Sequence, residues 1–274
     1  MIEIPESKVF ASRAENILSG KVVVDVINAT NPHRFAWYHG DPLLYSSILV
    51  GRKIENVKGF GCYIDICFDH DTHLAISDGT NMKYFQKADK CPQKFQLLVV
   101  FADSSYIVFT VAMYGGIFAF KGNFDYPYYL GSRDKLSPLD KRFDFDFFHK
   151  MITDTGKNMS VKALLATEQR IPGLGNGVLQ DILFNAGINP KRKINTLSEK
   201  DEKTLFVAIK ETLDNMVSEG GRDTEKDLLG NPGGYHCILS KNTCHELCPR
   251  CGGKIIKEAY LGGSIYYCRD CQTI

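Results

Sequence analysis

The chain has 274 residues, of which 44% are hydrophobic and 24% are charged. With 24 glycines and 10 prolines, it is neither disordered nor collagen-like, and its length predicts one large domain or two ordinary ones. The 33 basic and 32 acidic residues leave a net charge of +1, so composition predicts no broad attraction to a polyanion. A polyanionic partner would have to be recognised at local sites.

The apolar runs are all far shorter than the roughly 18 residues needed to cross a bilayer, so no membrane partner is expected. The N-terminal residues have no basic segment and no apolar core of the kind found in secretory signals, which predicts a cytoplasmic location. The nine cysteines are odd in number, and without an export signal a disulfide framework is not expected. We expect a monomer.

The first half of the chain predicts one helix followed by strands. Apolar residues recur at helical spacing over 6–20, where Gly20 ends the pattern. Short runs rich in Val, Ile, Phe and Tyr then predict strands at 22–27, 47–50, 62–68, 72–76, 95–101 and 106–110. These strands favour an antiparallel sandwich or barrel. The aperiodic segment 126–144 is expected to be a linker.

The second half is predicted to be helical. Apolar spacing indicates helices at 147–159, 160–169, 177–186 and 198–219. Ser198 and Asp201 form a capping pair at the start of the last helix, and Gly220 follows its end. The fold class is therefore α+β.

Paired cysteines near the C-terminus give the strongest chemical signal. Two CxxC pairs, separated by sixteen residues, lie at Cys248, Cys251, Cys268 and Cys271. Two such turns on a hairpin provide a tetrahedral four-thiolate shell that suits one structural Zn²⁺ ion per chain. Disulfides or idle thiols are the alternative. Second-choice ligands nearby are His236, Cys237, Cys244 and His245.

A glycine-rich turn at 171–176 lies between two predicted helices. Gly173 and Gly175 allow a tight turn with backbone N–H groups exposed at the start of the next helix, which favours a phosphate anion. Asn176 adds a side-chain donor. The alternative is a turn with no binding role.

Three segments together resemble one known family: MIEIPE at 1–6, the stretch 171–193, and CPRC followed by CRDC at 248–271. They resemble the formamidopyrimidine-DNA glycosylase and endonuclease VIII family along the whole chain. The resemblance implies a β-sandwich catalytic-type domain (1–133), a linker (134–145), a helical domain with a helix-two-turns-helix module (146–230) and a zinc finger (231–274). It also implies base excision repair, in which a damaged base is flipped out of double-stranded DNA and its glycosidic bond is broken. Strand cleavage by β-elimination usually follows in this family.

The family's nucleophile is the secondary amine of a proline exposed when Met is removed. Here Ile2 occupies that position, and its size favours retention of Met1, whose primary amine becomes the candidate nucleophile, displaced by one residue. Glu3 matches the family's general acid, with a surface carboxylate as the alternative. Glu6 also matches, and its alternative role is to interact with a helix dipole.

Three positions depart from the family pattern. Cys62 replaces a phosphate-binding Lys, for which Lys58 is a poor substitute, and Gly263 replaces a phosphate-binding Arg. The loop at 111–116 lacks the family's usual wedge sequence. Met113 and Tyr114 are candidate wedges in this loop, and Ile76, which falls at the position of the family's Met wedge, is a further candidate. Ordinary core or loop positions are the alternative for all three.

Because these phosphate contacts are missing, we expect weaker DNA binding than is typical of the family. The remaining candidate contacts are Gly173, Gly175, Asn176, Lys191, Arg192, Lys193, Arg250 and Lys254. We expect a DNA glycosylase with weakened or altered glycosylase and lyase chemistry. The alternatives are a catalytically silent DNA-structure binder and an RNA-binding protein on the same fold.

Overall fold

The computed structural model of the chain describes residues 1–155 and 158–274. It divides into two compact units, each described by itself below. The first comprises residues 1–2, 6–133 and 225–233, and the second comprises 3–5, 134–224 and 234–274. The finer division into sandwich, linker, helical domain and finger stays a prediction.

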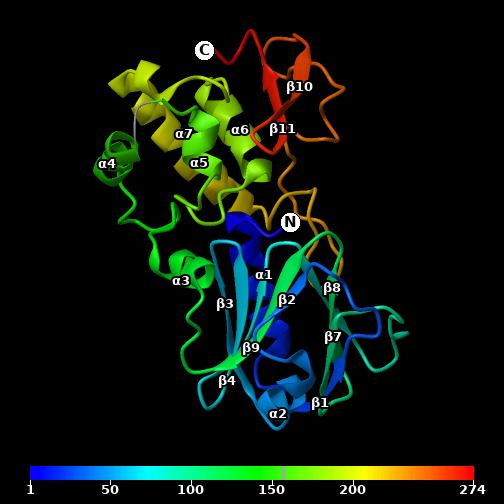
Figure 1. Cartoon of the computed structure of the whole chain (residues 1–274). Helices are drawn as coiled ribbons and strands as arrows, with labels where there is room; N and C mark the ends of the chain where they lie inside the picture. The colour runs from blue at the N-terminus through cyan, green and yellow to red at the C-terminus, as the bar shows by residue number, and fades with distance from the viewer. Residues whose placement is uncertain (156–157) are drawn as a thin grey trace. The chain divides into compact units, whose positions relative to one another are not determined.

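The first unit contains two β-sheets (Figure 1). One has the strand order β2-β9-β5-β4-β3 and the other β1-β7-β8-β6. The strands are β1 (Val23–Asn28), β2 (Ala36–Tyr38), β3 (Ile54–Phe60), β4 (Tyr63–Phe68), β5 (Thr72–Ser77), β6 (Thr80–Phe85), β7 (Leu97–Phe101), β8 (Tyr106–Val111) and β9 (Gly115–Lys121). Both sheets contribute to a single buried cluster, so the sandwich alternative is confirmed.

Side-chain alternation on the strands builds this core. In β4, Ile64 and Ile66 enter the cluster shared by the two sheets, whereas Tyr63 joins an aromatic cluster on the opposite face. The helix α1 (Ile4–Leu18) adds apolar residues to the shared cluster. A Cβ at Gly59 would lie 1.8 Å from the carbonyl oxygen of Ser7, so glycine is what lets α1 approach β3 closely.

Several sequence predictions for this unit are wrong in detail. The predicted strand 47–50 lies instead in the helix α2 (Tyr45–Leu49), which follows the short 3₁₀ helix η1 (Pro42–Leu44). Tyr45 and Leu49 are both fully buried at i, i+4 spacing, and a short apolar run cannot distinguish this pattern from a strand. The segment 126–144, predicted to be a linker, contains the helix α3 (Pro127–Asp134). The pairing of β2 with β9 is parallel.

The second unit is mainly helical (Figure 1). Its elements are α4 (Phe145–Thr155), α5 (Val161–Ala166), α6 (Asn176–Ala186), the short 3₁₀ helix η2 (Ile194–Thr196) and α7 (Glu199–Ser218). The predicted helix 147–159 includes residues 156–157, which lie outside the described residues. The predicted helix 160–169 ends early, because Glu168 and Gln169 have φ values of 56° and 50°. The capping box of Ser198 and Asp201 is confirmed.

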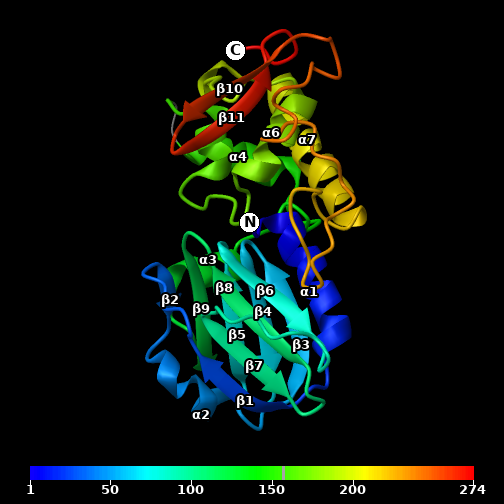
Figure 2. The ribbon, with the colours of Figure 1, turned by 90° about the vertical axis from the view of Figure 1, so that its right-hand side faces the viewer.

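The C-terminal part of this unit is an antiparallel hairpin of β10 (Ile255–Tyr260) and β11 (Gly263–Cys268), whose two strands lie side by side in Figure 2. It is fixed to α6 by Gln180, whose Oε1 accepts the Tyr266 N–H at 3.0 Å and whose Nε2 donates to the Ser264 carbonyl at 3.1 Å. Within the described residues, no helix is both long and apolar enough to cross a membrane.

Candidate functional site

The Glu3 carboxylate lies at the N-terminus of α6 in the second unit. Its Oε1 accepts the Gly177 N–H at 2.9 Å, and its Oε2 accepts the Val178 N–H at 2.7 Å. These are N–H groups that have no partner within the helix, and the positive end of the helix dipole favours a negative charge here. Glu3 is only 2% exposed, so the alternative of a surface carboxylate is wrong.

Arg222 lies beside Glu3. Its Nη1 lies 3.5 Å from Glu3 Oε2, and both side chains are 3% exposed. Two glycines make room for this arrangement: a Cβ at Gly175 would lie 2.5 Å from Glu3 Oε1, and one at Gly177 would lie 1.7 Å from Arg222 Nη1. The Glu3 carboxylate is therefore held by two N–H donors and a buried cation. A side chain at Gly175 would displace the Glu3 carboxylate, and one at Gly177 would displace the Arg222 guanidinium.

The glycine-rich turn serves this carboxylate directly. Gly173 has a φ of +78°, a conformation that favours glycine, and its carbonyl accepts the Ile4 N–H at 2.9 Å. We expected the N–H groups at the start of α6 to be exposed for a phosphate. Those of Gly177 and Val178 instead donate to Glu3, so an anionic side chain of the chain itself takes that place.

Asn176 begins α6 beside the hairpin. Its Nδ2 donates to the Ser264 carbonyl at 2.9 Å, whereas its buried Oδ1 has no hydrogen-bond partner among the described residues. A Cβ at Gly263 would lie 2.4 Å from Asn176 Nδ2. The position at which the family has an arginine is thus crowded by Asn176, and a side chain there would require Asn176 to move.

The chain terminus makes its contacts within the first unit. The Met1 α-amine pairs with the Glu225 carboxylate. Ile2 is 8% exposed within the sandwich core, and its N–H donates to Asp78 Oδ1 at 2.8 Å. Glu6 is buried in the first turn of α1, where its negative charge interacts favourably with the positive end of the helix dipole. The candidate nucleophile at Met1 is therefore already engaged by a carboxylate.

Cys62 provides no positive charge. It is half-buried, and burial together with the Asp78 charge raises the pKa of its thiol to about 11, so the thiol is neutral at pH 7. Lys58 is exposed on β3 and pairs in register with Asp65, not with Cys62.

The wedge candidates differ in exposure. Ile76 is 1% exposed in the sandwich core, whereas Met113 is 74% and Tyr114 41% exposed. Trp37, the one tryptophan of the chain, is 49% exposed with its ring centroid 6.0 Å from that of Tyr114. Trp37 was not predicted from the sequence, although a lone tryptophan in the aromatic run FAWYH at 35–39 was an available signal.

The basic candidates at 191–193 have partners in the chain itself. Lys191 pairs with Glu258, and Arg192 Nη2 lies 2.7 Å from Asp201 Oδ2. Lys193 is exposed and donates to a backbone carbonyl at 3.0 Å. Part of the positive charge in this segment is therefore neutralised by internal ion pairs.

The remaining two basic candidates lie next to the four-cysteine cluster. Arg250 is exposed, with its guanidinium 4.5 Å from the ring centroid of Phe184, and Lys254 is exposed at the start of the hairpin.

The four cysteines of the hairpin lie together, with all four sulfur atoms within 4.8 Å of one another. Cys248 Sγ is 3.7 Å from Cys271 Sγ, and Cys251 Sγ is 3.5 Å from Cys268 Sγ. A disulfide would require about 2.05 Å, whereas tetrahedral coordination with bonds of about 2.3 Å places sulfur atoms roughly 3.8 Å apart. The set fits a metal ion held by four thiolates.

The second-choice ligands at 236, 237, 244 and 245 do not belong to this cluster in the described part of the chain. His236 is exposed and lies 3.2 Å from Asp223.

A β-sandwich, a helical unit and a four-cysteine hairpin thus follow one another along the chain. The family model of the formamidopyrimidine-DNA glycosylase H2TH domain matches residues 135–227. This match, the full-length relatives and the similar solved structures indicate the formamidopyrimidine-DNA glycosylase and endonuclease VIII family.

Full-length relatives and solved structures agree with this assignment. The formamidopyrimidine-DNA glycosylase of Brevibacillus brevis is 26% identical, with 99% of each chain covered, and that of Mycoplasmopsis pulmonis is 27% identical, with 99% of this chain and 98% of the relative covered. The fold is similar to that of the MutM (Fpg) protein of Thermus thermophilus (TM-score 0.81, 22% identity, 98% of each chain). It is also similar to Lactococcus lactis Fpg in complex with DNA containing an abasic site (TM-score 0.84, 22% identity, 99% of this chain and 100% of that chain).

Proposed function

We propose that the chain is a base-excision-repair DNA glycosylase that acts on damaged double-stranded DNA. One observation carries the proposal: the carboxylate at the family's catalytic position, Glu3, is held in a defined place by two N–H groups and Arg222. Gly175 and Gly177 have no side chain that would displace it. This degree of preorganisation is what a general acid requires, because its position relative to the reacting atom determines proton transfer.

In the proposed reaction, Glu3 acts as general acid/base: it takes up the proton lost by the attacking amine or water and delivers it to the sugar ring oxygen or the base as the glycosidic bond breaks. The nucleophile at C1′ is the Met1 α-amine or a water molecule activated by a carboxylate. Attack by the amine requires its ion pair with Glu225 to open first. This additional step, together with Ile2 in place of proline, makes strand cleavage the weaker part of the activity.

DNA binding is proposed to use the turn at Gly173 and Gly175, Asn176 at the start of α6, the basic residues 191–193, and Arg250 and Lys254. Met113 and Tyr114 supply exposed apolar and aromatic surface that suits a wedge in the gap left by a flipped base. Trp37, beside Tyr114, extends that surface.

The four-cysteine cluster is proposed to hold one structural Zn²⁺ ion. A closed shell of four thiolates has no open position, so the ion supports the hairpin and does not activate water. Asn176 and Gln180 contact this hairpin, so the ion also supports the residues at the start of α6.

A second candidate function is a catalytically silent DNA-structure binder. It is favoured by Ile2, Cys62 and Gly263, which replace the family's nucleophile and two phosphate-binding cations. A neutral thiol at position 62 is consistent with it.

Borohydride trapping separates the two functions. The chain is incubated with duplexes containing oxidised bases or an abasic site, with borohydride added in one arm, and adduct and free base are measured. The proposed glycosylase releases free base, and an adduct that disappears when the N-terminus is blocked identifies the amine as nucleophile. Binding to these duplexes with neither product favours the silent binder and rejects the enzyme.

A further inference from the structure

A cluster of three potential metal ligands lies on the outer face of the five-stranded sheet, within the first unit. Asp65 and Cys67 are two residues apart on β4, so their side chains point to the same face. His73 on β5 is directly opposite Cys67 in the register, and the small residue Ala75 is opposite Asp65. This pairing brings a carboxylate, a thiol and an imidazole to one place and leaves room between them.

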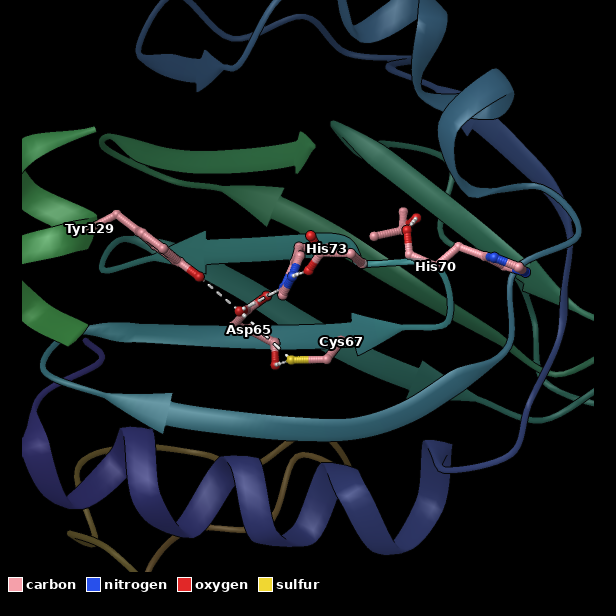
Figure 3. A network of polar contacts seen from close by, with 7 residues as sticks. Asp65, Cys67, His70, His73 and Tyr129 are labelled. Atoms are coloured by element: carbon pink, nitrogen blue, oxygen red, sulfur yellow. Dashed lines mark hydrogen bonds and ion pairs between the residues drawn. The ribbon is translucent and has the colours of Figure 1, made fainter. Parts of the chain in front are cut away.

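The ligand atoms are mutually close. His73 Nδ1 lies 3.0 Å from Asp65 Oδ2, Cys67 Sγ lies 3.8 Å from the same oxygen, and all three ligand atoms fall within 4.8 Å of one another. Figure 3 shows His73 and Tyr129 approaching Asp65 from two sides, whereas His70 points away from the group. Tetrahedral zinc with bonds of about 2.0–2.3 Å holds its ligand atoms roughly 3.3–3.8 Å apart, so the present spacing requires only small shifts.

Each of two ligands has a partner that fixes its orientation. His73 Nε2 lies 3.4 Å from Asp71 Oδ1, and the imidazole stacks on Phe120 at 4.9 Å and 7°. The Tyr129 hydroxyl donates to Asp65 Oδ2 at 2.8 Å. A carboxylate on the far nitrogen of a histidine and a hydrogen bond to a ligating carboxylate are the usual supports of metal ligands.

The turn before β5 places Asp71 for this contact. His70 and Asp71 both have positive φ values, 56° and 54°, in the short connection between β4 and β5. The Asp71 carbonyl accepts the Gly122 N–H at 2.8 Å, which anchors the turn to the end of β9. Two non-glycine residues in this conformation are uncommon, and here they bring a carboxylate to the outer nitrogen of His73.

We propose that Asp65, Cys67 and His73 bind a divalent transition-metal ion of the zinc class. The ligand charges suit a buried site, because one carboxylate, one thiolate and one neutral imidazole balance the charge of a divalent ion. Asp65 is 3% exposed and His73 18% exposed, so the ion enters from the His73 side. Three protein ligands leave a fourth position for water or another small ligand, unlike the closed four-thiolate hairpin.

Metal stoichiometry tests this proposal with the full chain. The purified protein is incubated with excess Zn²⁺ under reducing conditions, passed through a desalting column, and analysed for metal per chain by mass spectrometry. We expect two ions per chain in the wild type and one in Cys67→Ser and His73→Asn. Cys62→Ser is the matched control, a half-buried thiol outside the cluster, and should retain two.

Cobalt provides a second reading that does not depend on the folding of any variant. Added Co²⁺ should produce a thiolate charge-transfer band on wild-type protein whose hairpin already holds zinc. In a separate comparison that does use a variant, Tyr129→Phe should weaken this binding about 10–100-fold. The proposal is overturned if zinc-saturated wild type holds one ion and gives no such band. It is also overturned if the second ion remains in either Cys67→Ser or His73→Asn, which would show that the three side chains form only a polar network.

Discussion

At the scale of single residues, the site is defined by what surrounds Glu3. Its carboxylate combines hydrogen bonds from the first turn of α6 with an ion pair to Arg222, and both charged groups are buried. Removing one member of a buried pair leaves the other without compensation, which makes such pairs sensitive to substitution. Small changes near Glu3 should therefore have large effects.

The substitution Gly175→Ala tests this packing. The added Cβ would lie 2.5 Å from Glu3 Oε1, so the carboxylate must leave its N–H donors. We expect a loss of about 1–3 kcal/mol in the free energy of unfolding, measured by urea denaturation. Gly131→Ala is the control, because its Cβ in the helix α3 meets nothing within 4 Å. Equal effects of the two substitutions would contradict the packing role of Gly175.

Asp181 predicts a pH dependence of stability. This buried carboxyl of α6 accepts N–H groups from Ile238 at 2.9 Å and Leu239 at 2.8 Å, yet burial raises its pKa from 3.8 to about 6. Because the folded chain binds this proton more tightly than the unfolded chain, the stabilising contribution is present below the unfolded pKa. It is lost as the pH rises through about 6.

Urea denaturation of the wild type and Asp181→Asn across this pH range measures the effect. The difference in unfolding free energy, wild type minus variant, should fall by about 2 kcal/mol between roughly pH 4 and pH 7. A pH-independent difference between the two proteins would show that Asp181 does not titrate in this way.

At the scale of elements, the helix ends are explained by local sequence. The longest helix, α7, begins with a reciprocal capping box in which the Ser198 hydroxyl accepts the Asp201 N–H and the Asp201 carboxylate accepts the Ser198 N–H. Such a cap satisfies N–H groups that have no partner within the helix.

Replacing Ser198 with alanine should cost about 1 kcal/mol of unfolding free energy, measured by urea denaturation. The control is Ser218→Ala at the other end of α7, where the hydroxyl only donates back to the Asn215 carbonyl. A loss at Ser218 as large as that at Ser198 would argue against the capping box as the cause.

Sequence patterns predicted the elements that have a clear period or an end signal and missed those defined by distant contacts. The helix at 177–186 and the capping box at 198 follow from local residues. The helix α2 was mistaken for a strand because the burial of Tyr45 and Leu49 depends on the sandwich core. Likewise, Glu3 and the cysteines were found by motif, whereas no local signal connects Glu3 with Arg222, which reaches it only in the folded unit.

At the scale of the whole molecule, the near-neutral net charge is accompanied by ion pairs that engage basic residues within the chain. The chain carries a net charge of +1, and basic residues proposed to contact DNA, such as Lys191 and Arg192, form ion pairs with Glu258 and Asp201. Each internal pair reduces the charge available for phosphate neutralisation. The protein should therefore bind DNA with a shallow dependence on salt.

Glu258→Gln tests this view by releasing Lys191. We expect tighter binding to duplex DNA and a salt slope, log K against log salt concentration, that is steeper by about 1. The matched control is Glu199→Gln, which makes the same change of charge but releases Lys203, a residue of an exposed i, i+4 pair on α7. Equal shifts in both variants would show that only net charge matters and that Lys191 has no particular role.

The most direct test of the central claim is single-turnover release of free base from a lesion-containing duplex by the wild type and by Glu3→Gln, with DNA affinity measured in parallel. If Glu3 is the general acid, base release should fall at least about 100-fold in the variant while affinity changes little. Base release at an undiminished rate by Glu3→Gln, or no release by the wild type from any oxidised-base duplex that it binds, would contradict this account.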